Sequence, residues 1–267
     1  MRAVRLLVRT VACAVTVLVL VPVVVLGLPF AQAVGRLGAW RAHMTRVWSR
    51  CLCWVLGAEV EVVGRAPRGS FVLVANHLSY VDVLVLGSCL PCTFVSKSDV
   101  GSWPVLGWLS RLAGTIFVDR ARRRDVLRVG RQIEAALREG RAVVLFPEGT
   151  SSAGDGVLPF RSSLLEPAAT LELPVHYASL RYATDPGEVP ARLSVAWWGD
   201  MEFVPHVVGL LKLPGFRARI VFGEDPVKTS ERKSLAARLH AAVASRFLPM
   251  LPDEDACLTS RTSPANS

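Results

Sequence analysis

The chain has little of what several common classes of functional site require. It contains only three tyrosines, and no aromatic–basic motif of an RNA-binding domain occurs in it. No G-x-S-x-G elbow is present, so a serine hydrolase of the α/β class is unsupported. Cys89 and Cys92 have the spacing of a metal or redox pair, but no second Cys/His pair with zinc spacing accompanies them. We therefore expect neither a metal site nor a nucleic-acid partner.

A nucleotide-binding loop and a disulfide framework are also missing. The glycines at 149 and 154 have the spacing of a phosphate-binding loop, but Asp155 and Gly156 stand where that loop requires Lys and Ser or Thr. Six cysteines in 267 residues are too few to form a stabilising disulfide framework in a chain of this size. We expect buried or incidental thiols, which fits a reducing, cytosolic side.

The composition that is present favours a basic, membrane-associated protein. Lys and Arg number 31 against 22 Asp and Glu, which gives a net charge of +9. Most of the basic residues are Arg, which suits recognition of phosphate or carboxylate groups. Because the N-terminal region is so apolar, an anionic membrane surface fits this charge better than nucleic acid does.

The N-terminal region predicts a membrane segment. Residues 10–30 form a run of about 20 residues without charge, which is long enough to span a bilayer. The motif Ala31-Gln32-Ala33 leaves a cleaved signal peptide as an alternative. Pro22, Gly27 and Pro29 also permit a bent, re-entrant hairpin. Over residues 36–53, arginines alternate with Trp and Leu, and this pattern is typical of an amphipathic interfacial helix.

The remaining chain alternates between strand and helix patterns. We predict strands at 60–63, 71–75, 93–96, 114–118, 142–146, 175–181, 193–197 and 217–222, and helices at 81–90, 104–112, 122–139 and 230–247. This order predicts an α/β fold with a mixed, largely parallel sheet flanked by helices. The organisation that we expect is a membrane-attachment segment at 1–54, one domain at 55–250, and a polar, disordered tail at 251–267.

The most informative motif runs from Asn76 to Asp82, directly after a buried strand. A sharp turn into a helix would bring Asp82 beneath His77. A neutral imidazole whose one N–H is held by a carboxylate presents its other nitrogen as a base. The alternative is a polar strand-to-helix turn, in which Asn76 and Ser79 cap the chain and His77 is merely exposed.

Polar clusters also follow three other predicted strands. They are Lys97, Asp119-Arg120 and Glu148-Gly149-Thr150. Ligands of such sheets collect outside the carboxyl ends of the strands, so the four clusters together predict one cleft. Lys97 and Arg120 could hold an anionic group there. Taken singly, each cation is better explained as surface charge beside a strand.

In their order along the chain, these motifs resemble the glycerolipid acyltransferase family, which includes the bacterial 1-acylglycerol-3-phosphate acyltransferases. The family pattern N-H-x-S-x-x-D matches residues 76–82, F-V-D-R matches 117–120, and F-P-E-G-T-x-S matches 146–152. A Pro-centred apolar strand is matched more loosely at 173–176. The order and separations agree over roughly residues 58–225, and the apolar N-terminus agrees too.

The resemblance implies transfer of a fatty acyl group from acyl-CoA or acyl carrier protein to the hydroxyl of a lysolipid, without metal or cofactor and without an acyl-enzyme. His77 would be the general base and Asp82 its orienting partner. Arg120 would contact the acceptor's anionic head, and Glu148 and Gly149 would shape its site. The further substrate-binding candidates are Asn76, Lys97, Thr150 and Arg161. The expected location is the inner membrane, with the site facing the cytoplasm.

The third block departs from the family pattern. Family members acting on lysophosphatidate commonly carry Arg where Ser151 stands, and residues 158–164 replace the frequent F-K-x-G pattern. This sequence pattern resembles the branch of the family that acylates lyso-ornithine lipids, although Arg161 could supply the missing cation. We expect 1-acyl-sn-glycerol-3-phosphate as acceptor, with a lyso-ornithine lipid as the alternative. A non-catalytic lipid-binding scaffold is the alternative of another class.

Overall fold

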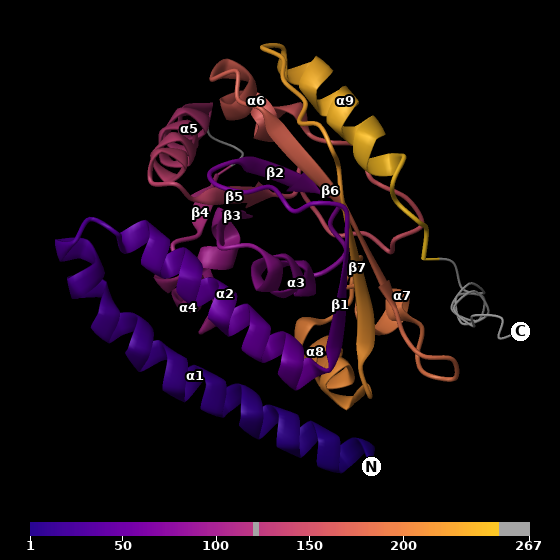
Figure 1. The fold of residues 1–267 in the computed structure, drawn as a ribbon. Coiled ribbons are helices and arrows are strands. Elements are labelled where there is room, and N and C mark those ends of the chain that lie inside the picture. The colour runs from indigo at the N-terminus through magenta and orange to yellow at the C-terminus, as the bar shows by residue number, and fades with distance from the viewer. Residues whose placement is uncertain (120–122, 251–267) are drawn as a thin grey trace, which may run out of the picture.

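A computed structural model of the chain describes residues 1–119 and 123–250 (Figure 1). Within these residues, seven strands form one sheet in the order β1-β7-β6-β2-β5-β3-β4. Their bounds are β1 Ala58–Val63, β2 Val72–Ala75, β3 Cys92–Lys97, β4 Ile116–Val118, β5 Ala142–Leu145, β6 Val175–Ala183 and β7 Phe216–Phe222. Strands β2 to β6 run parallel, whereas β7 is antiparallel to β6 and carries β1 parallel to itself. The predicted mixed, largely parallel sheet is confirmed.

Helices cover both faces of the sheet, so the body has three layers (Figure 1). One layer holds α2 Leu37–Leu56, α3 Val81–Cys89 and α8 Phe203–Lys212, and the other holds α5 Arg123–Arg138, α6 Ser162–Thr170 and α9 Arg232–Ala244. The remaining helices are α1 Arg2–Ala33, α4 Leu106–Leu112, α7 Ala191–Ser194 and the 3-10 turn η1 Ser98–Ser102. Helix α1 lies outermost, against α2.

The central strand β2 is buried along its whole length. Leu73 and Ala75 belong to the apolar core beneath α2, α3 and α8, while Val72 and Val74 belong to the core beneath α5, α6 and α9. Such burial on both faces is the reason that a strand of a covered parallel sheet is a continuous apolar run. The strand therefore holds the turn that follows it rigidly at the carboxyl edge of the sheet.

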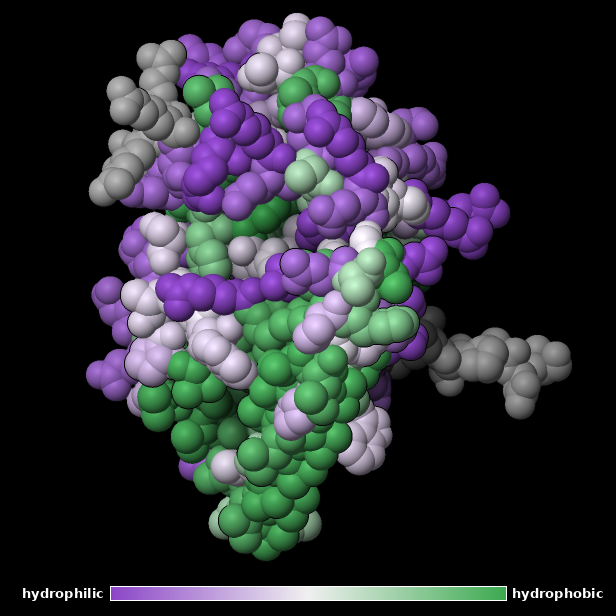
Figure 2. All heavy atoms as spheres, turned by 90° about the vertical axis from the view of Figure 1, so that its left-hand side faces the viewer, coloured by the Kyte–Doolittle hydropathy of each residue, from purple (hydrophilic) through white to green (hydrophobic). Residues whose placement is uncertain are grey.

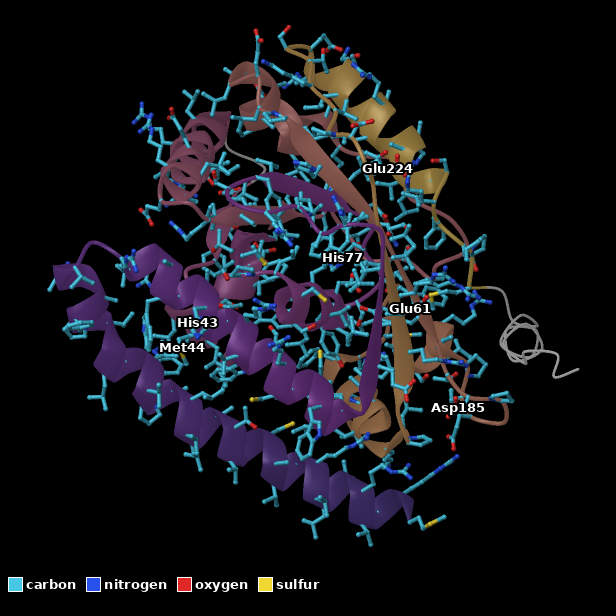
Figure 3. All side chains as sticks on the ribbon, viewed as in Figure 1. His43, Met44, Glu61, His77, Asp185 and Glu224 are labelled. Atoms are coloured by element: carbon cyan, nitrogen blue, oxygen red, sulfur yellow. The ribbon has the colours of Figure 1, made fainter. Side chains whose placement is uncertain are left out.

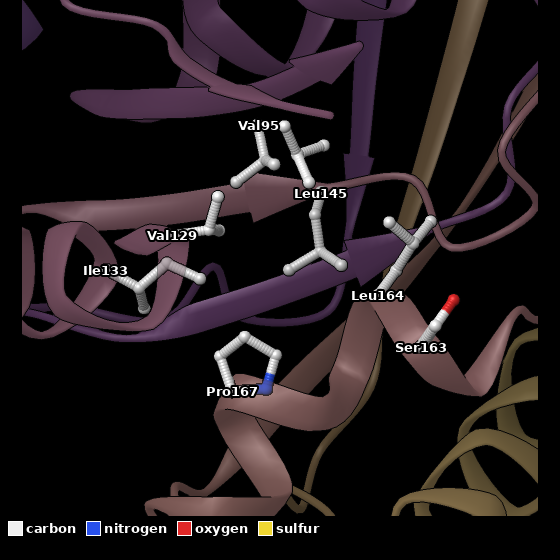
Figure 4. A pocket seen from close by; sticks show the side chains of 8 residues that line it. Val95, Val129, Ile133, Leu145, Ser163, Leu164 and Pro167 are labelled. Carbon is white, nitrogen blue, oxygen red and sulfur yellow. The ribbon is translucent and has the colours of Figure 1, made fainter. Parts of the chain in front are cut away.

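The second core contains only a small hollow, which Figure 4 shows from close by. It lies between the sheet and helices α5 and α6 and has a volume of about 10 Å³. Its lining comes from Val95, Val118, Val129, Ile133, Leu145, Ser163, Leu164 and Pro167. This volume is at the lower limit for a single water molecule, so the hollow is not a ligand site.

Helix α1 runs without a break through Pro22 and Pro29, so the bent hairpin that we considered within it does not form. The chain turns instead at residues 34–36, and α2 packs back along α1 (Figure 1). Gly27 makes this close approach possible, because a Cβ at that position would lie 2.3 Å from the Trp40 ring. The N-terminal region is thus a helical hairpin made of two whole helices.

The predicted strand at 193–197 is wrong. The segment forms one turn of helix, α7, followed by an extended connection. The Ser194 hydroxyl bonds back to the Val189 and Pro190 carbonyls, while the Trp197 N–H donates to the Leu78 carbonyl. Val195 and Ala196 are buried, whereas Leu193 is 50% exposed, and the Trp197 N–H bonds to the turn after β2 and not to a neighbouring strand. Helices α6 and α8 were also not predicted; Pro167 and Pro205 obscure their patterns.

Two predictions fall outside the described residues. They are the disordered tail at 251–267 and the substrate contact of Arg120. The N-terminal helix, at Arg2–Ala33, begins eight residues before the predicted 10–30, and the other elements match their predicted positions to within a few residues.

Candidate active site

His77 and Asp82 meet at the carboxyl end of β2, as their spacing predicts. The His77 Nδ1 atom lies 2.6 Å from Asp82 Oδ2, and His77 lies near the centre of the molecule in Figure 3. A carboxylate only accepts hydrogen bonds, so we assign the ring proton to Nδ1. Nε2 then keeps its lone pair, and the side chain is 23% exposed. The alternative of a merely exposed, capping turn does not describe this pair.

The Asp82 carboxylate is completely buried and is held by four hydrogen bonds. Oδ2 accepts the N–H groups of Leu78, at 2.7 Å, and Ser79, at 3.1 Å, as well as His77 Nδ1. Oδ1 accepts the Tyr182 hydroxyl at 2.5 Å. A buried charge is tolerated when its lone pairs are satisfied in this way. Asp82 is therefore anchored as the fixed end of the pair.

The His77 ring is also held from its face and through its backbone. Phe146, the residue after β5, stacks on the imidazole with 4.3 Å between centroids and 14° between planes. The His77 carbonyl accepts the Ser152 N–H at 2.9 Å. The loop after β5 therefore restricts the orientation of the imidazole ring, whose side chain stays 23% exposed.

Glu148 connects the motif at 146–152 directly to the motif at 76–82. Its Oε1 accepts the His77 N–H at 3.1 Å, and the residue is almost fully buried. Gly149, at φ +78°, makes the turn behind it, a conformation that favours glycine. Burial, with a smaller contribution from the Asp82 charge, raises the pKa of Glu148 from near 4.5 to about 8, although the His77 and Leu158 N–H groups oppose the rise.

A dependence of stability on pH follows from this pKa. A carboxyl group whose pKa is higher in the folded than in the unfolded state contributes stability that is full below about pH 4.5 and is lost as the pH rises toward about 8. Glu148→Gln, which stays neutral, should remove this part of the pH dependence. Thermal melts between pH 5 and 8.5 test this, and an unchanged pH slope in the variant would show that Glu148 is ionised throughout.

The other predicted binding residues occupy different environments. Arg161 is exposed beside the Glu148 turn, since its N–H donates to the Pro147 carbonyl at 2.8 Å. Thr150 is exposed at the same turn. Lys97 is the last residue of β3 and pairs with Asp99, and both side chains are more than half exposed. Arg161 and Thr150 therefore belong to the Glu148 turn, whereas the Lys97 ammonium is paired with Asp99.

Asn76 bonds to the sheet and not to the His77–Asp82 pair. Its side chain is fully buried, donates to the Leu180 carbonyl at 3.0 Å and accepts the Leu180 N–H at 2.7 Å. The amide thus continues the pairing of β2 with β6 beyond the last residue of β2. This side chain is committed to the sheet and positions the His77 turn, and contact with substrate would require breaking both bonds.

Comparisons with known proteins agree with this geometry. A family model described as Acyltransferase matches residues 59–180. The chain is 33% identical over 231 residues to the lyso-ornithine lipid O-acyltransferase of Brucella abortus (strain 2308), covering 79% of this chain and 86% of that protein. The chain belongs to the acyltransferase family. The family resemblance of the sequence motifs is therefore confirmed, and the protein is an enzyme that acylates lysolipids.

One further relative and one solved structure are also similar to this acyltransferase. It is 33% identical over 188 residues to the 1-acyl-sn-glycerol-3-phosphate acyltransferase of Neisseria meningitidis serogroup B (strain MC58), covering 70% of this chain and 73% of that protein. The crystal structure of the 1-acyl-sn-glycerophosphate acyltransferase PlsC from Thermotoga maritima matches with a TM-score of 0.68 and 20% identity, over 99% of this chain and 100% of that one. The latter match shows the shared fold.

Sequence reasoning missed three contacts of this acyltransferase site. Tyr182 and Trp197 come from segments 100 or more residues after Asp82, and Phe146 was taken as the end of a strand and the start of the third motif, with no contact to His77 predicted. The Ser151 hydroxyl donates to the Trp197 carbonyl, which connects the third block to the segment that also bonds to Leu78. No local spacing signals these contacts, because the sheet order alone brings the segments together.

Proposed function

We propose that His77 is the general base of direct acyl transfer from a thioester to the hydroxyl of a lysolipid. The observation that carries this role is the completely buried Asp82 carboxylate on Nδ1 of a partly exposed His77. With the ring proton assigned to Nδ1, the Nε2 lone pair is free to accept a proton. Placing a base within reach of the attacking hydroxyl is worth about 10²–10⁴ in rate. Positioning of the two substrates supplies much of the remainder.

The proposed reaction balances without a cofactor or an acyl-enzyme. Nε2 of His77 takes the hydroxyl proton as the acceptor oxygen attacks the thioester carbonyl. The tetrahedral intermediate then collapses, the C–S bond breaks, and the thiol leaves with the proton from His77. The imidazolium that exists between these steps lies against the Asp82 carboxylate. We propose acyl-CoA or acyl carrier protein as the donor.

For the acceptor we propose a lyso-ornithine lipid. Four relatives with this printed activity, from Brucella, Rhizobium, Rhodobacter and Pseudomonas, are 33–36% identical over 76–80% of this chain. Ser151 also supports the proposal. Its hydroxyl donates to the Trp197 carbonyl, and serine brings no positive charge to the position where lysophosphatidate enzymes commonly carry Arg. An amino-acid head with one carboxylate needs fewer cations than a phosphate monoester of charge about −1.5 to −2.

The second candidate acceptor is 1-acyl-sn-glycerol-3-phosphate. It is favoured by the Neisseria relatives and by Arg161, which is exposed beside Glu148 and forms no ion pair with any residue that the structure describes. Arg161 would then hold the phosphate, in a charge-assisted hydrogen bond worth about 1.5–3 kcal/mol.

A competition assay separates the two acceptors. Purified protein is given one acyl thioester and equal amounts of both lysolipids, and the acylated products are measured by mass spectrometry. We expect a kcat/KM ratio that favours the lyso-ornithine lipid by at least about 10-fold, which is about 1.4 kcal/mol. A preference for lysophosphatidate that Arg161→Ala removes would establish the second candidate, and acylation of neither lipid would refute the function.

We further propose that the exposed face of α1 attaches the protein to the membrane. Helix α1 is long and apolar enough to cross a bilayer, and only 6% of its most apolar window is buried. Figure 2 shows the resulting continuous apolar surface over the lower part of the molecule. However, both ends of α1 are tied to the same body. Arg5 and Arg9 donate to the carbonyls of residues 212–214, and the other end continues into α2.

With both ends on one body, α1 fits a position along one leaflet better than a transmembrane one. The proposed location is the cytoplasmic face of the inner membrane. The five cysteines among the described residues are free thiols, which suits this reducing side.

The proposed attachment predicts the effect of charge on α1. Leu18 and Leu26 are 72% and 78% exposed, and moving an aspartate into the apolar part of a leaflet is unfavourable. The double variant Leu18→Asp, Leu26→Asp should lose binding to anionic vesicles in a flotation assay. The matched control is Leu127→Asp, since Leu127 is 67% exposed on α5, on the opposite layer. Equal binding of the two variants would contradict the proposed surface.

A further inference from the structure

The two oxygens of Asp82 are held by different parts of the molecule. All three hydrogen bonds to Oδ2 come from residues 77–79, the turn that also carries Asp82 at the start of α3. The only bond found on Oδ1 among the described residues comes from the Tyr182 hydroxyl, 100 positions later, on β6. Tyr182 is thus the connection between the carboxylate and the sheet.

Tyr182 is itself rigidly placed. Its side chain is 1% exposed in the core beneath α3, and its ring meets Phe216 of β7 edge to face at 5.7 Å between centroids. Strand β6 pairs with β2 on one side and β7 on the other. Because β6 is paired on both sides, the Tyr182 hydroxyl keeps its position even if the turn at residues 77–79 moves. It therefore fixes the position of the Asp82 Oδ1 atom.

We propose that Tyr182 is a positioning residue of the acyl-transfer site, which fixes the plane of the Asp82 carboxylate so that Oδ2 meets His77 Nδ1. This inference rests on the proposed role of His77 as base. Two oxygens held from opposite sides leave the carboxylate no rotation about its Cβ–Cγ bond. The imidazole direction then follows from the carboxylate, and so does the position of Nε2 relative to the acceptor hydroxyl.

The donor role of Tyr182 is secured by its surroundings. Burial, with the charge of Asp82, raises the pKa of the Tyr182 hydroxyl well above its usual value, so the proton stays on the phenol. The titratable groups that face this pair are His77 on the turn, Glu148 after β5 and Cys53 on α2. A fixed neutral donor stabilises the ionised carboxylate without adding charge.

Tyr182→Phe isolates the hydroxyl, because the ring still fills the same space against Phe216. The variant should turn over about 10-fold more slowly, with the KM for the lysolipid changed less than about 2-fold, as expected for lost alignment and not lost binding. Since the carboxylate loses a donor, the acid limb of the pH–kcat profile should move to higher pH. Thermal melts report whether the variant is folded.

Tyr177→Phe is the matched control. Tyr177 lies on the same strand but on the other face, in the second core, where its ring packs beneath the Arg246 guanidinium at 5.1 Å. This variant should keep both the turnover and the pH profile. Combined with His77→Ala, Tyr182→Phe should cause no additional loss, because a positioning residue has nothing left to position.

A measurement that does not depend on activity completes the test. In ¹⁵N-histidine-labelled protein, the Nδ1 proton of the short His77–Asp82 bond should resonate far downfield and vanish in His77→Ala. Tyr182→Phe should shift this signal, and Tyr177→Phe should not. An unshifted signal with unchanged kcat and pH profile in folded Tyr182→Phe would overturn the positioning role. A shifted signal in a protein that transfers no acyl group would refute the proposed function but not the geometry.

Discussion

Replacing His77 by alanine should lower acyl transfer by at least about 1,000-fold while leaving the fold and the membrane attachment intact. Nε2 is the atom proposed to accept the hydroxyl proton, and loss of a positioned general base costs about 10²–10⁴ in rate. The side chain contributes little to the core, being partly exposed above the Phe146 ring. Turnover is measured with purified protein, an acyl thioester and the preferred lysolipid.

His43→Ala is the control for this experiment. His43 is exposed on α2 and lies well away from His77 in Figure 3, so its replacement should leave turnover unchanged. The KM for the lysolipid should change little in either variant if His77 acts in the chemical step. Full turnover in folded His77→Ala protein would remove the base assignment, whatever the acceptor proves to be.

Asp82→Asn should have the second largest effect, and the geometry says why. Oδ2 accepts from His77, Leu78 and Ser79 together, so the oxygen of asparagine can take that place and keep the proton on Nδ1. Its NH₂ group would then face Tyr182, whose hydroxyl can accept instead of donate. The variant thus keeps the ring orientation but loses the negative charge beside the imidazolium. We expect turnover to fall about 100-fold or more.

Asp82→Ala should be less stable to unfolding than Asp82→Asn. This difference separates the effect of the carboxylate's charge from that of its hydrogen-bond network. Removing the carboxylate leaves the Leu78 and Ser79 N–H groups and the buried Tyr182 hydroxyl without partners, and each such buried group costs about 1–3 kcal/mol. Urea unfolding monitored by circular dichroism measures the difference. Wild-type turnover in Asp82→Asn would show that the charge is not used, and equal stability of the two variants would contradict the hydrogen-bond network.

Much of this site could be predicted because its signals are local. The spacing of His77 and Asp82 lies within one turn, and the continuous apolar run before it predicts a strand buried on both faces. The blocks after β2 and β5 lie on neighbouring parallel strands, which is why Glu148 reaches the His77 backbone. Parallel strands end at the same edge, so the meeting of these two motifs follows from the predicted fold.

The remainder depends on contacts that no local pattern contains. Tyr182 reaches Asp82 only because β6 lies beside β2, and the sequence does not state the order of strands. Lys97 is the last residue of β3, and its ammonium pairs with Asp99, two residues later. Residues 194–196 are buried and the segment has a strand-like pattern, yet Trp197 bonds to the turn at Leu78 and not to a strand. Long-range hydrogen bonds decide the Tyr182 and Trp197 cases, whereas a local ion pair decides that of Lys97.

The coupling of thiol release to lipid acylation tests the central claim most directly. Purified protein is mixed with an acyl thioester, and free thiol is followed with and without the lysolipid. Direct attack by the acceptor hydroxyl, with His77 as base, predicts one thiol released per lipid acylated, and almost none without acceptor or in His77→Ala. A burst of one thiol per protein molecule without acceptor, or equal turnover in His77→Ala, would contradict the account.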